Sequence, residues 1–348
     1  VTPVTLDSLT SGFNIGKDKT TDVYFNEMLG FTENEVKEIL RHYEAGNSAG
    51  LMDDLRRLYN GSLFSSRASE RIYNSNMVWY FLSEYFPSQN YPQKLIDSNI
   101  ASDYGKIKNL FYINSSAEHR RKLNEIITAG ETTASITEKY SFERALTPDD
   151  FVSLLFYNGM LTIKDAQLSL VRFQIPNYVI REIYWSFFKD EMLLLPHAGI
   201  DESNLQNALL DLAQNNNMKR WIGEIEKVLE LLSNRDYQNF DEKYIKMLFI
   251  TLASLTQLYI IKSEAEAGGE YPDLMYLYRR PYEPNYQFLL ELKYLKTNEE
   301  KKQSSVLLHA KEQVRRYLNK PEIKQLKNLK SYAVVFTGKK GHFEEIIS

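Results

Sequence analysis

Apolar residues recur at helical spacing through most of the first 140 residues of the chain. The clearest helix start is at Thr32, which is followed by Glu35 and by apolar residues at positions 36, 39 and 40. This spacing predicts a capping box ahead of an amphipathic helix. Gly, Asn and Pro interrupt the pattern repeatedly, and a Thr/Ser-rich segment at 132–137 precedes the domain boundary that we expect near residue 140. The other predicted elements of this mostly helical region span residues 52–59, 77–85, 107–113 and 118–129.

Residues 141–200 have a different pattern, in which two helices flank a short hairpin. Pro148 stands at the first turn of a predicted helix that ends at Tyr157. Asn158-Gly159 then turns the chain into two predicted strands, 160–163 and 168–174, and a second helix begins at Pro176. This order is typical of a winged-helix unit, which binds DNA or packs domains together. Because few residues here are basic, we favour the packing role and predict a winged-helix-like connector.

The last block, residues 201–348, has the most regular order of elements. Helical spacing is followed by three strands, by a basic helix and by a final strand, which gives the order α-β-β-β-α-β. We therefore predict an α/β fold, α+β overall, in which this core follows a helical region and the connector. The helices are predicted at 204–232 (with a break near 215–217), 240–252 and 303–318, and the strands at 259–265, 273–278, 286–295 and 331–337.

The composition excludes several classes of protein. The chain has 348 residues, of which 43% are hydrophobic, 25% are charged and none is Cys. A disulfide scaffold, a thiol nucleophile, a Cys-ligated zinc ion and an iron–sulfur cluster are therefore excluded. No apolar run approaches the roughly 20 residues that span a bilayer, and no signal segment opens the chain. We predict a cytoplasmic protein with no membrane partner.

The charge of the chain is unevenly distributed. Residues 279–340 carry 15 Lys and Arg against 6 Asp and Glu, whereas the other 286 residues carry 27 basic and 40 acidic side chains. A local balance of +9 is compatible with a polyanionic ligand such as nucleic acid. The simpler interpretation is a solvated Lys-rich helix, which the charge alone favours.

Candidate chemistry lies on the second and third predicted strands of the last block. The turn between them, residues 279–285, contains two Pro residues, and a hairpin centred on Tyr282 places Asp273 directly across from Glu291. Two carboxylates held in this way repel each other unless a cation lies between them, and a hard divalent ion such as Mg²⁺ prefers oxygen ligands. Strand alternation places Lys293 on the same face as Glu291.

Two acids, a lysine and a metal ion are the groups needed for in-line hydrolysis of a phosphodiester, because the metal ion and the lysine stabilise the developing charge. The alternative is a surface hairpin on which Glu291 and Lys293 form an exposed ion pair of little energetic value. A Glu-x-Lys triplet is common by itself. The register-matched Asp273 within the α-β-β-β-α-β order makes the catalytic interpretation more specific.

The sequence Pro272-Asp273 … Glu291-Leu292-Lys293 resembles the signature of the PD-(D/E)XK nuclease superfamily, whose restriction-endonuclease-like core has this element order. The spacing of Gln313 and Tyr317 resembles the Q-x-x-x-Y motif of one large branch. The resemblance implies catalytic roles for Asp273, Glu291, Lys293, Gln313 and Tyr317, with Mg²⁺ or Mn²⁺ as the cofactor. The implied metal ligands are Asp273, Glu291 and Glu242, with Asp241, Glu264 and Glu266 as further candidates, and the implied nucleic-acid-binding residues are Lys311, Arg315 and Arg316.

Short motifs outside this core resemble bacterial proteins that join an AAA-ATPase-like region to this nuclease. The chain has no G-x-x-x-x-G-K-[ST] loop and no Walker B strand, so we expect no ATP site in it. The resemblance implies an ATPase core upstream of Val1, which this chain would contact. The motifs are Ser11-Gly12-Phe13-Asn14, Gly30-Phe31-Thr32, Tyr59-Asn60-Gly61, Tyr73-Asn74, Leu155-Phe156-Tyr157-Asn158-Gly159 and Ile175-Pro176-Asn177.

The sequence thus predicts a metal-dependent nuclease that acts on nucleic acid, with DNA favoured over RNA. The predicted domains are an ATPase-like helical region at 1–140, the winged-helix-like connector at 141–200 and the nuclease-like domain at 201–348. The main alternative is a catalytically inactive nuclease-fold module that binds nucleic acid or a protein partner and is regulated by an upstream ATPase region. A third hypothesis is a regulatory fragment of an ATP-driven machine. The sequence predicts no oligomeric state.

Overall fold

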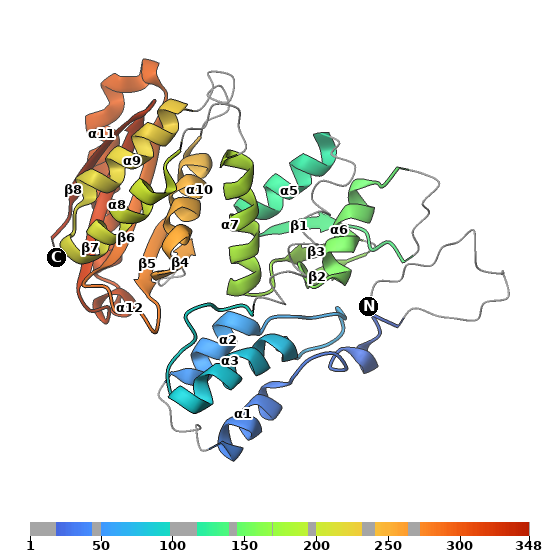
Figure 1. Ribbon diagram of the computed structural model, residues 1–348. Helices are drawn as coiled ribbons and strands as arrows, with labels where there is room; N and C mark the ends of the chain where they lie inside the picture. Colours follow the sequence, from blue (N-terminus) through green and yellow to red (C-terminus); the bar gives the residue numbers. More distant parts are fainter. Residues whose placement is uncertain are drawn as a thin grey trace. The chain divides into compact units, whose positions relative to one another are not determined.

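The computed structural model describes most of the chain, and its helices and strands are labelled in Figure 1. Two compact units, Val1–Tyr184 and Trp185–Ser348, divide within helix α7 (Tyr178–Leu193). The element predicted at 107–113 and the candidate residues Glu264 and Glu266 lie outside the described residues. The described ranges are 19–43, 50–97, 117–138, 145–168, 170–193, 200–231, 241–263 and 272–347.

The first unit begins with helices that the sequence predicted closely. Thr32 caps the first of them, because its hydroxyl accepts a hydrogen bond from the Glu35 amide while the Glu35 carboxylate accepts one from the Thr32 amide. The predicted capping box is confirmed. A short 3-10 turn, η1, precedes this helix. The elements are η1 (Val23–Phe25), α1 (Glu33–His42), α2 (Leu51–Tyr59) and α3 (Ser75–Ser88).

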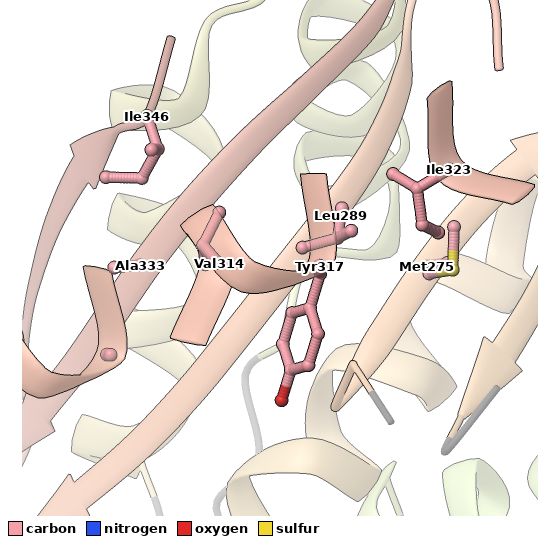
Figure 2. Close-up of a cluster of buried hydrophobic side chains, with 8 residues drawn as sticks. Met275, Leu289, Val314, Tyr317, Ile323, Ala333 and Ile346 are labelled. Atoms are coloured by element: carbon pink, nitrogen blue, oxygen red, sulfur yellow. The ribbon is translucent and has the colours of Figure 1, made fainter. Parts of the chain in front are cut away.

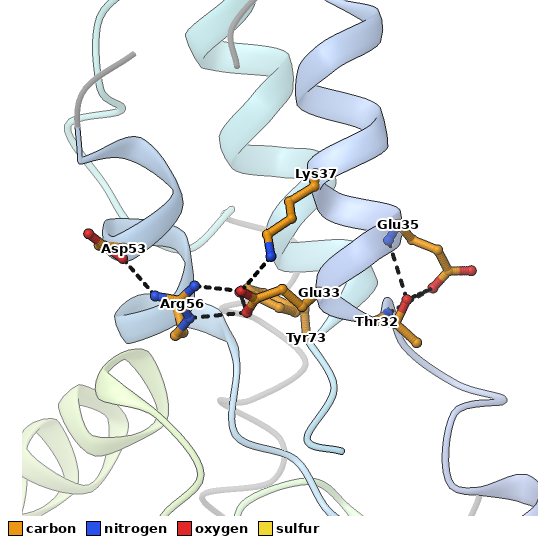
Figure 3. A network of polar contacts seen from close by, with 7 residues as sticks. All are labelled: Thr32, Glu33, Glu35, Lys37, Asp53, Arg56 and Tyr73. Carbon is orange, nitrogen blue, oxygen red and sulfur yellow. Dashed lines mark hydrogen bonds and ion pairs between the residues drawn. The ribbon is translucent and has the colours of Figure 1, made fainter. Parts of the chain in front are cut away.

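A polar network joins α1 to α2 and to the residues ahead of α3 (Figure 3). The Arg56 guanidinium donates to both oxygens of Glu33, at 3.0 and 2.5 Å, and also to Asp53. Lys37 lies 3.1 Å from the same Glu33 carboxylate, and the Tyr73 hydroxyl donates to it at 3.1 Å. The hydrogen bonds from Arg56 are the main reason that the pKa of Glu33 is lowered to about 2. The network links three segments by a bidentate, charge-assisted contact.

A three-stranded antiparallel sheet lies further along the first unit, with the strand order β1-β3-β2. Its first strand was not predicted, because the Thr/Ser-rich segment was interpreted as a break. Thr132 and Ala134 are each 2% exposed, so alternate residues of this segment are buried against the unit, and β-branched Thr suits a strand. The elements are α5 (Ala117–Ala129), β1 (Glu131–Ala134), α6 (Pro148–Tyr157), β2 (Thr162–Gln167) and β3 (Leu170–Gln174).

The second unit contains a five-stranded sheet with the order β4-β5-β6-β7-β8, in which only β6 and β7 run parallel. The predicted α-β-β-β-α-β order is confirmed, and the fold is of the mixed α/β class. β8, which was not predicted, extends the sheet beyond β7. The helices are α8 (Glu202–Asn215), α9 (Met218–Leu231), α10 (Glu242–Ala253), α11 (Gln303–Leu318) and α12 (Pro321–Lys324), and the strands are β4 (Tyr259–Ser263), β5 (Leu274–Tyr278), β6 (Gln287–Leu295), β7 (Leu329–Thr337) and β8 (Lys340–Glu345).

The β5–β6 hairpin has the predicted register. Leu274 pairs with Leu290 and Tyr276 with Phe288, as a hairpin centred on Tyr282 requires. Asp273 itself lies one residue before β5, directly beyond the last pair of the ladder. The prediction that Asp273 and Glu291 come from opposing positions of one hairpin is therefore confirmed by the register.

Side chains of α11 cover one face of this sheet (Figure 2). Met275, Leu289 and Ala333 lie at positions of β5, β6 and β7 that point to the same face, since residues two apart along a strand share a side. Ala310, Val314 and Tyr317 of α11 pack against them, and Ile323 and Ile346 complete the buried cluster. This packing fixes β6 between its neighbours, and β6 carries the candidate residues Glu291 and Lys293.

α9 and β8 approach each other closely at Gly341. A Cβ added there would lie 2.6 Å from Cγ2 of Ile222 and 2.9 Å from Cζ of Phe336, which is closer than real contacts allow. Glu226 of α9 also accepts a hydrogen bond from the Gly341 amide at 2.8 Å. Glycine is thus required where the last strand meets this helix.

Candidate active site

Four charged residues from three separate segments converge near the middle of β6. Glu291 and Lys293 lie on β6, and Asp273 lies just before β5. Glu242 is the first residue of α10, a helix that Asp241 caps by accepting a hydrogen bond from the Tyr244 amide. Asp241, an alternative metal ligand in the sequence analysis, therefore serves as an N-cap.

The ammonium group of Lys293 lies among the three carboxylates. Its Nζ is 2.8 Å from Oε1 of Glu291 and 3.4 Å from Oδ2 of Asp273. The same nitrogen is 3.4 Å from Oε1 of Glu242. An ammonium has three donors and no acceptor, so these three oxygens match its hydrogen-bonding capacity. The side chain of Glu291 is 2% exposed and that of Lys293 is 18% exposed, so water screens this ion pair poorly.

A backbone group holds Asp273 in place. Oδ2 of Asp273 accepts a hydrogen bond from the Leu292 amide at 2.9 Å, and this bond ties the residue before β5 to the middle of β6. The contribution of Leu292 could not be predicted from the sequence, because a backbone donor leaves no signal in residue identity. Oε2 of Glu291, in contrast, is buried and has no hydrogen-bond partner in the described part of the chain.

Burial and like charge raise the pKa values of two acids of this site, Glu291 and Glu242. The pKa of Glu291 is raised to about 7, first by burial and then by the charge of Asp273, and the contact with Lys293 only partly offsets this. Burial also raises the pKa of Glu242. Burial acts to lower the pKa of Lys293, but the surrounding carboxylates outweigh it and the pKa is raised. Lys293 is therefore held as a cation.

The donors of the site suit a hard metal ion by their chemistry. All three acids offer carboxylate oxygens, and the buried Oε2 of Glu291 is free to accept a cation. Among the residues that the structure describes, no group of three or more His, Cys, Asp and Glu side chains is already placed to hold a metal ion. The carboxylates instead surround the ammonium of Lys293. By the chemistry of their oxygen donors, the residues fit a divalent ion.

The structure places Gln313 and Tyr317 on α11. Tyr317 is 4% exposed and packs in the hydrophobic cluster, with its hydroxyl directed away from the other labelled side chains in Figure 2. Oε1 of Gln313 is buried and has no hydrogen-bond partner among the described residues. Neither side chain is a solvent-exposed contact for a macromolecule in this structure.

Many basic residues of the 279–340 segment are paired with acids. Lys311, a predicted contact for nucleic acid, forms an ion pair with Glu344. Arg315 and Arg316 lie on the exposed side of α11. The local charge of +9 is thus partly neutralised by acids that follow it in sequence or lie on α9. The other pairs are Lys330 with Glu345 at 2.8 Å and Lys340 with Glu226 and Glu230 at 3.2 and 3.4 Å.

The mixed five-stranded sheet, its flanking helices and the acid–acid–lysine cluster define a restriction-endonuclease-like core. Residues 240–346 match the family model described as the PD-(D/E)XK nuclease superfamily, and this range includes all four residues of the cluster. Members of the superfamily are usually nucleases and typically use divalent metal ions. No match was found among curated proteins. None of the described helices is long and apolar enough to cross a membrane.

Proposed function

We propose that this chain is a divalent-metal-dependent nuclease that hydrolyses phosphodiester bonds of nucleic acid, with DNA as the favoured substrate. One observation carries the proposal. Asp273 and Glu291 come from opposing positions of one hairpin, and a carboxylate oxygen of each lies within 3.4 Å of the ammonium nitrogen of Lys293. They lie inside the segment that matches a nuclease superfamily. Buried acids with raised pKa values are typical of a functional site, because they cost stability.

Asp273 and Glu291 are the proposed ligands of Mg²⁺ or Mn²⁺, and Glu242 at the start of α10 completes the acidic set. When bound, a divalent ion supplies charge stabilisation and lowers the pKa of water. The Leu292 amide orients Asp273, and the α11 cluster fixes the strand that carries Glu291. Lys293, kept cationic by its neighbours, binds the attacking water or the phosphate oxygens and offsets their negative charge.

Substrate binding is the proposed role of the exposed side of α11. Arg315 and Arg316 face solvent there and are suited to phosphate groups, because guanidinium binds them in two-donor geometry. Lys311 would first have to leave Glu344. Gln313 and Tyr317, being buried or half-buried, act by positioning β6 and its side chains.

A cleavage assay tests the proposal. Purified protein is incubated with single- and double-stranded DNA, and with RNA, in Mg²⁺, in Mn²⁺ or in EDTA. We expect metal-dependent cleavage that is lost in Lys293→Ala. The variant Lys330→Ala is the matched control, since it also removes one ion-paired lysine from the same sheet but leaves the site intact. Equal cleavage by Lys293→Ala and wild type would contradict the assignment, and binding without cleavage by every form would favour the inactive nuclease-fold module.

The proposal extends to the regions ahead of the nuclease core. We propose that residues 1–140 are the C-terminal part of an AAA-ATPase-like domain and that residues 141–200 form a winged-helix-like connector, with the nuclease-like domain at 201–348. The support is the resemblance of the short motifs and, for the connector, the helix–hairpin–helix order of α6, β2, β3 and α7.

A further inference from the structure

The charges around Lys293 do not balance. Three carboxylates, those of Asp273, Glu242 and Glu291, face one ammonium within 3.4 Å. With every group ionised, these four groups have a net charge of −2, and counting Lys246, whose charge also acts on Glu242, leaves −1. The Lys293 ammonium is therefore the cation bound by a cluster in which negative charges outnumber positive charges.

Lys293 also occupies the oxygens that a metal ion would need. A Mg²⁺ ion binds carboxylate oxygens at about 2.0–2.1 Å, and a positive ammonium as close to the same oxygens repels it. The contacts of Lys293 with Asp273 and Glu242 are both 3.4 Å, whereas the contact with Glu291 is 2.8 Å. The two longer contacts are the ones that are easier to give up.

Glu291 offers a place for both cations. Its Oε1 contacts Lys293, and its Oε2 is buried without a partner in the described segments. Burying a carboxylate oxygen with no hydrogen bond is costly, so this atom is a destabilising feature of the metal-free site. Asp273 would stay in position during an exchange, because the Leu292 amide also holds its Oδ2.

We propose that Lys293 is the built-in counter-ion of the metal-free site, and that a divalent ion enters by displacing its ammonium from Asp273 and Glu242. This inference rests on the proposed function. It adds that metal ion and lysine compete for the same oxygens. The ammonium stabilises the acidic cluster when no metal ion is bound. It also weakens metal binding, because the metal ion must displace it. A ligand that must displace a resident partner binds less tightly by the free energy of that contact.

Calorimetric titration of the full chain with Mn²⁺ tests the inference. The neutral variant Lys293→Met should bind Mn²⁺ about 5- to 100-fold more tightly than wild type, a range typical of coupling between two ligands. In EDTA the same variant should have a lower Tm, and saturating Mn²⁺ should raise its Tm by more than it raises that of wild type. Lys330→Met removes a lysine paired with Glu345 elsewhere in the sheet and should leave Mn²⁺ affinity unchanged.

Lys293→Arg keeps the charge and serves as a second variant if Lys293→Met does not fold. It should bind Mn²⁺ no more tightly than wild type. Equal or weaker Mn²⁺ binding by Lys293→Met, with wild-type binding intact and abolished by Asp273→Asn, would overturn the competition and leave the proposed function standing. Absence of Mn²⁺ binding in both wild type and Lys293→Met would overturn both.

Discussion

Two clusters of charged residues in this protein have different charge balances. In the first unit, Arg56 and Lys37 both contact the carboxylate of Glu33, which also accepts a hydrogen bond from Tyr73, and Arg56 also contacts Asp53, so two cations face two carboxylates (Figure 3). In the second unit, one ammonium serves three carboxylates. The pKa of Glu33 is lowered to about 2, whereas that of Glu291 is raised to about 7.

The difference in charge balance distinguishes a structural network from the proposed active site. A carboxylate with more cations than it needs is stabilised in its charged form, and its partners hold helices together. Buried carboxylates that outnumber their cations cost free energy, and a fold keeps such an arrangement where it binds or reacts with something. The direction of the pKa shift, rather than the number of charged residues, distinguishes the two clusters.

The largest expected effect comes from removing one carboxylate of the second cluster. Asp273→Asn keeps the shape of the side chain but removes a proposed metal-ligating oxygen, and we expect the proposed nuclease activity to fall at least about 100-fold. Gel-based cleavage of DNA in Mg²⁺ measures this. Glu345→Gln, which removes one carboxylate from β8 of the same sheet, is the control and should retain activity. Cleavage by Asp273→Asn at the wild-type rate would contradict a catalytic role for this cluster.

The second-largest expected effect is a loss of stability on truncating a core side chain of β6. Leu289 is fully buried on β6, in contact with the α11 cluster (Figure 2). Leu289→Ala should lower the free energy of unfolding by about 2–5 kcal/mol through lost burial and a cavity. Urea denaturation of metal-free protein measures it. A loss below about 0.5 kcal/mol would show that β6 is not fixed by this packing.

Substitution of Glu291, two residues away on the same strand, should raise the free energy of unfolding instead of lowering it. Its pKa is about 7 in the folded protein against a reference of 4.5, so its contribution to stability is full below pH 4.5 and is lost as the pH rises through 7. Glu291→Gln should therefore raise the unfolding free energy of the metal-free protein at pH 8 by about 1–3 kcal/mol, with little gain near pH 4.5. Urea denaturation in EDTA at several pH values measures this, and destabilisation at pH 8 would contradict it.

Glu33 should give the smallest effect and the reverse dependence on pH. Its pKa is lowered, so its contribution is present above the reference value of 4.5 and is lost as the pH falls through about 2. Because the Arg56 side chain is 45% exposed, solvent screening limits the loss in Glu33→Gln at pH 7 to about 1–2 kcal/mol. The exposed Glu38 of the same helix provides the control, Glu38→Gln. Equal free energies of unfolding for Glu33→Gln and Glu38→Gln at pH 7 would show that the network around Glu33 does not stabilise the first unit.

Local signals in the sequence predicted much of the fold. The capping box at Thr32 marked a helix start, and the basic helix at 303–318 has the predicted bounds. The hairpin register followed from the position of the Pro-containing turn, and this register brings Asp273 to Glu291. These features depend on neighbours in sequence, or on one turn, which is why a single chain reveals them.

The missed features depend on tertiary pairing. β8 carries Lys340, Glu344 and Glu345, so it lacks an apolar pattern and is a strand because β7 pairs with it. The same acids neutralise lysines of a segment that looked strongly basic. The contacts of Lys293 with three carboxylates were likewise not predicted, because the sequence pattern assigned those acids to a metal ion alone.

Asp273 and Glu291 are the proposed ligands of a divalent metal ion. The most direct measurement is an anomalous difference map from a crystal of the full chain soaked in Mn²⁺. We predict a peak within about 2.0–2.4 Å of carboxylate oxygens of both residues, a distance typical of hard divalent ions, and its loss in Asp273→Asn. A well-ordered site without such a peak at saturating Mn²⁺, or a peak that persists unchanged in Asp273→Asn, would contradict the claim.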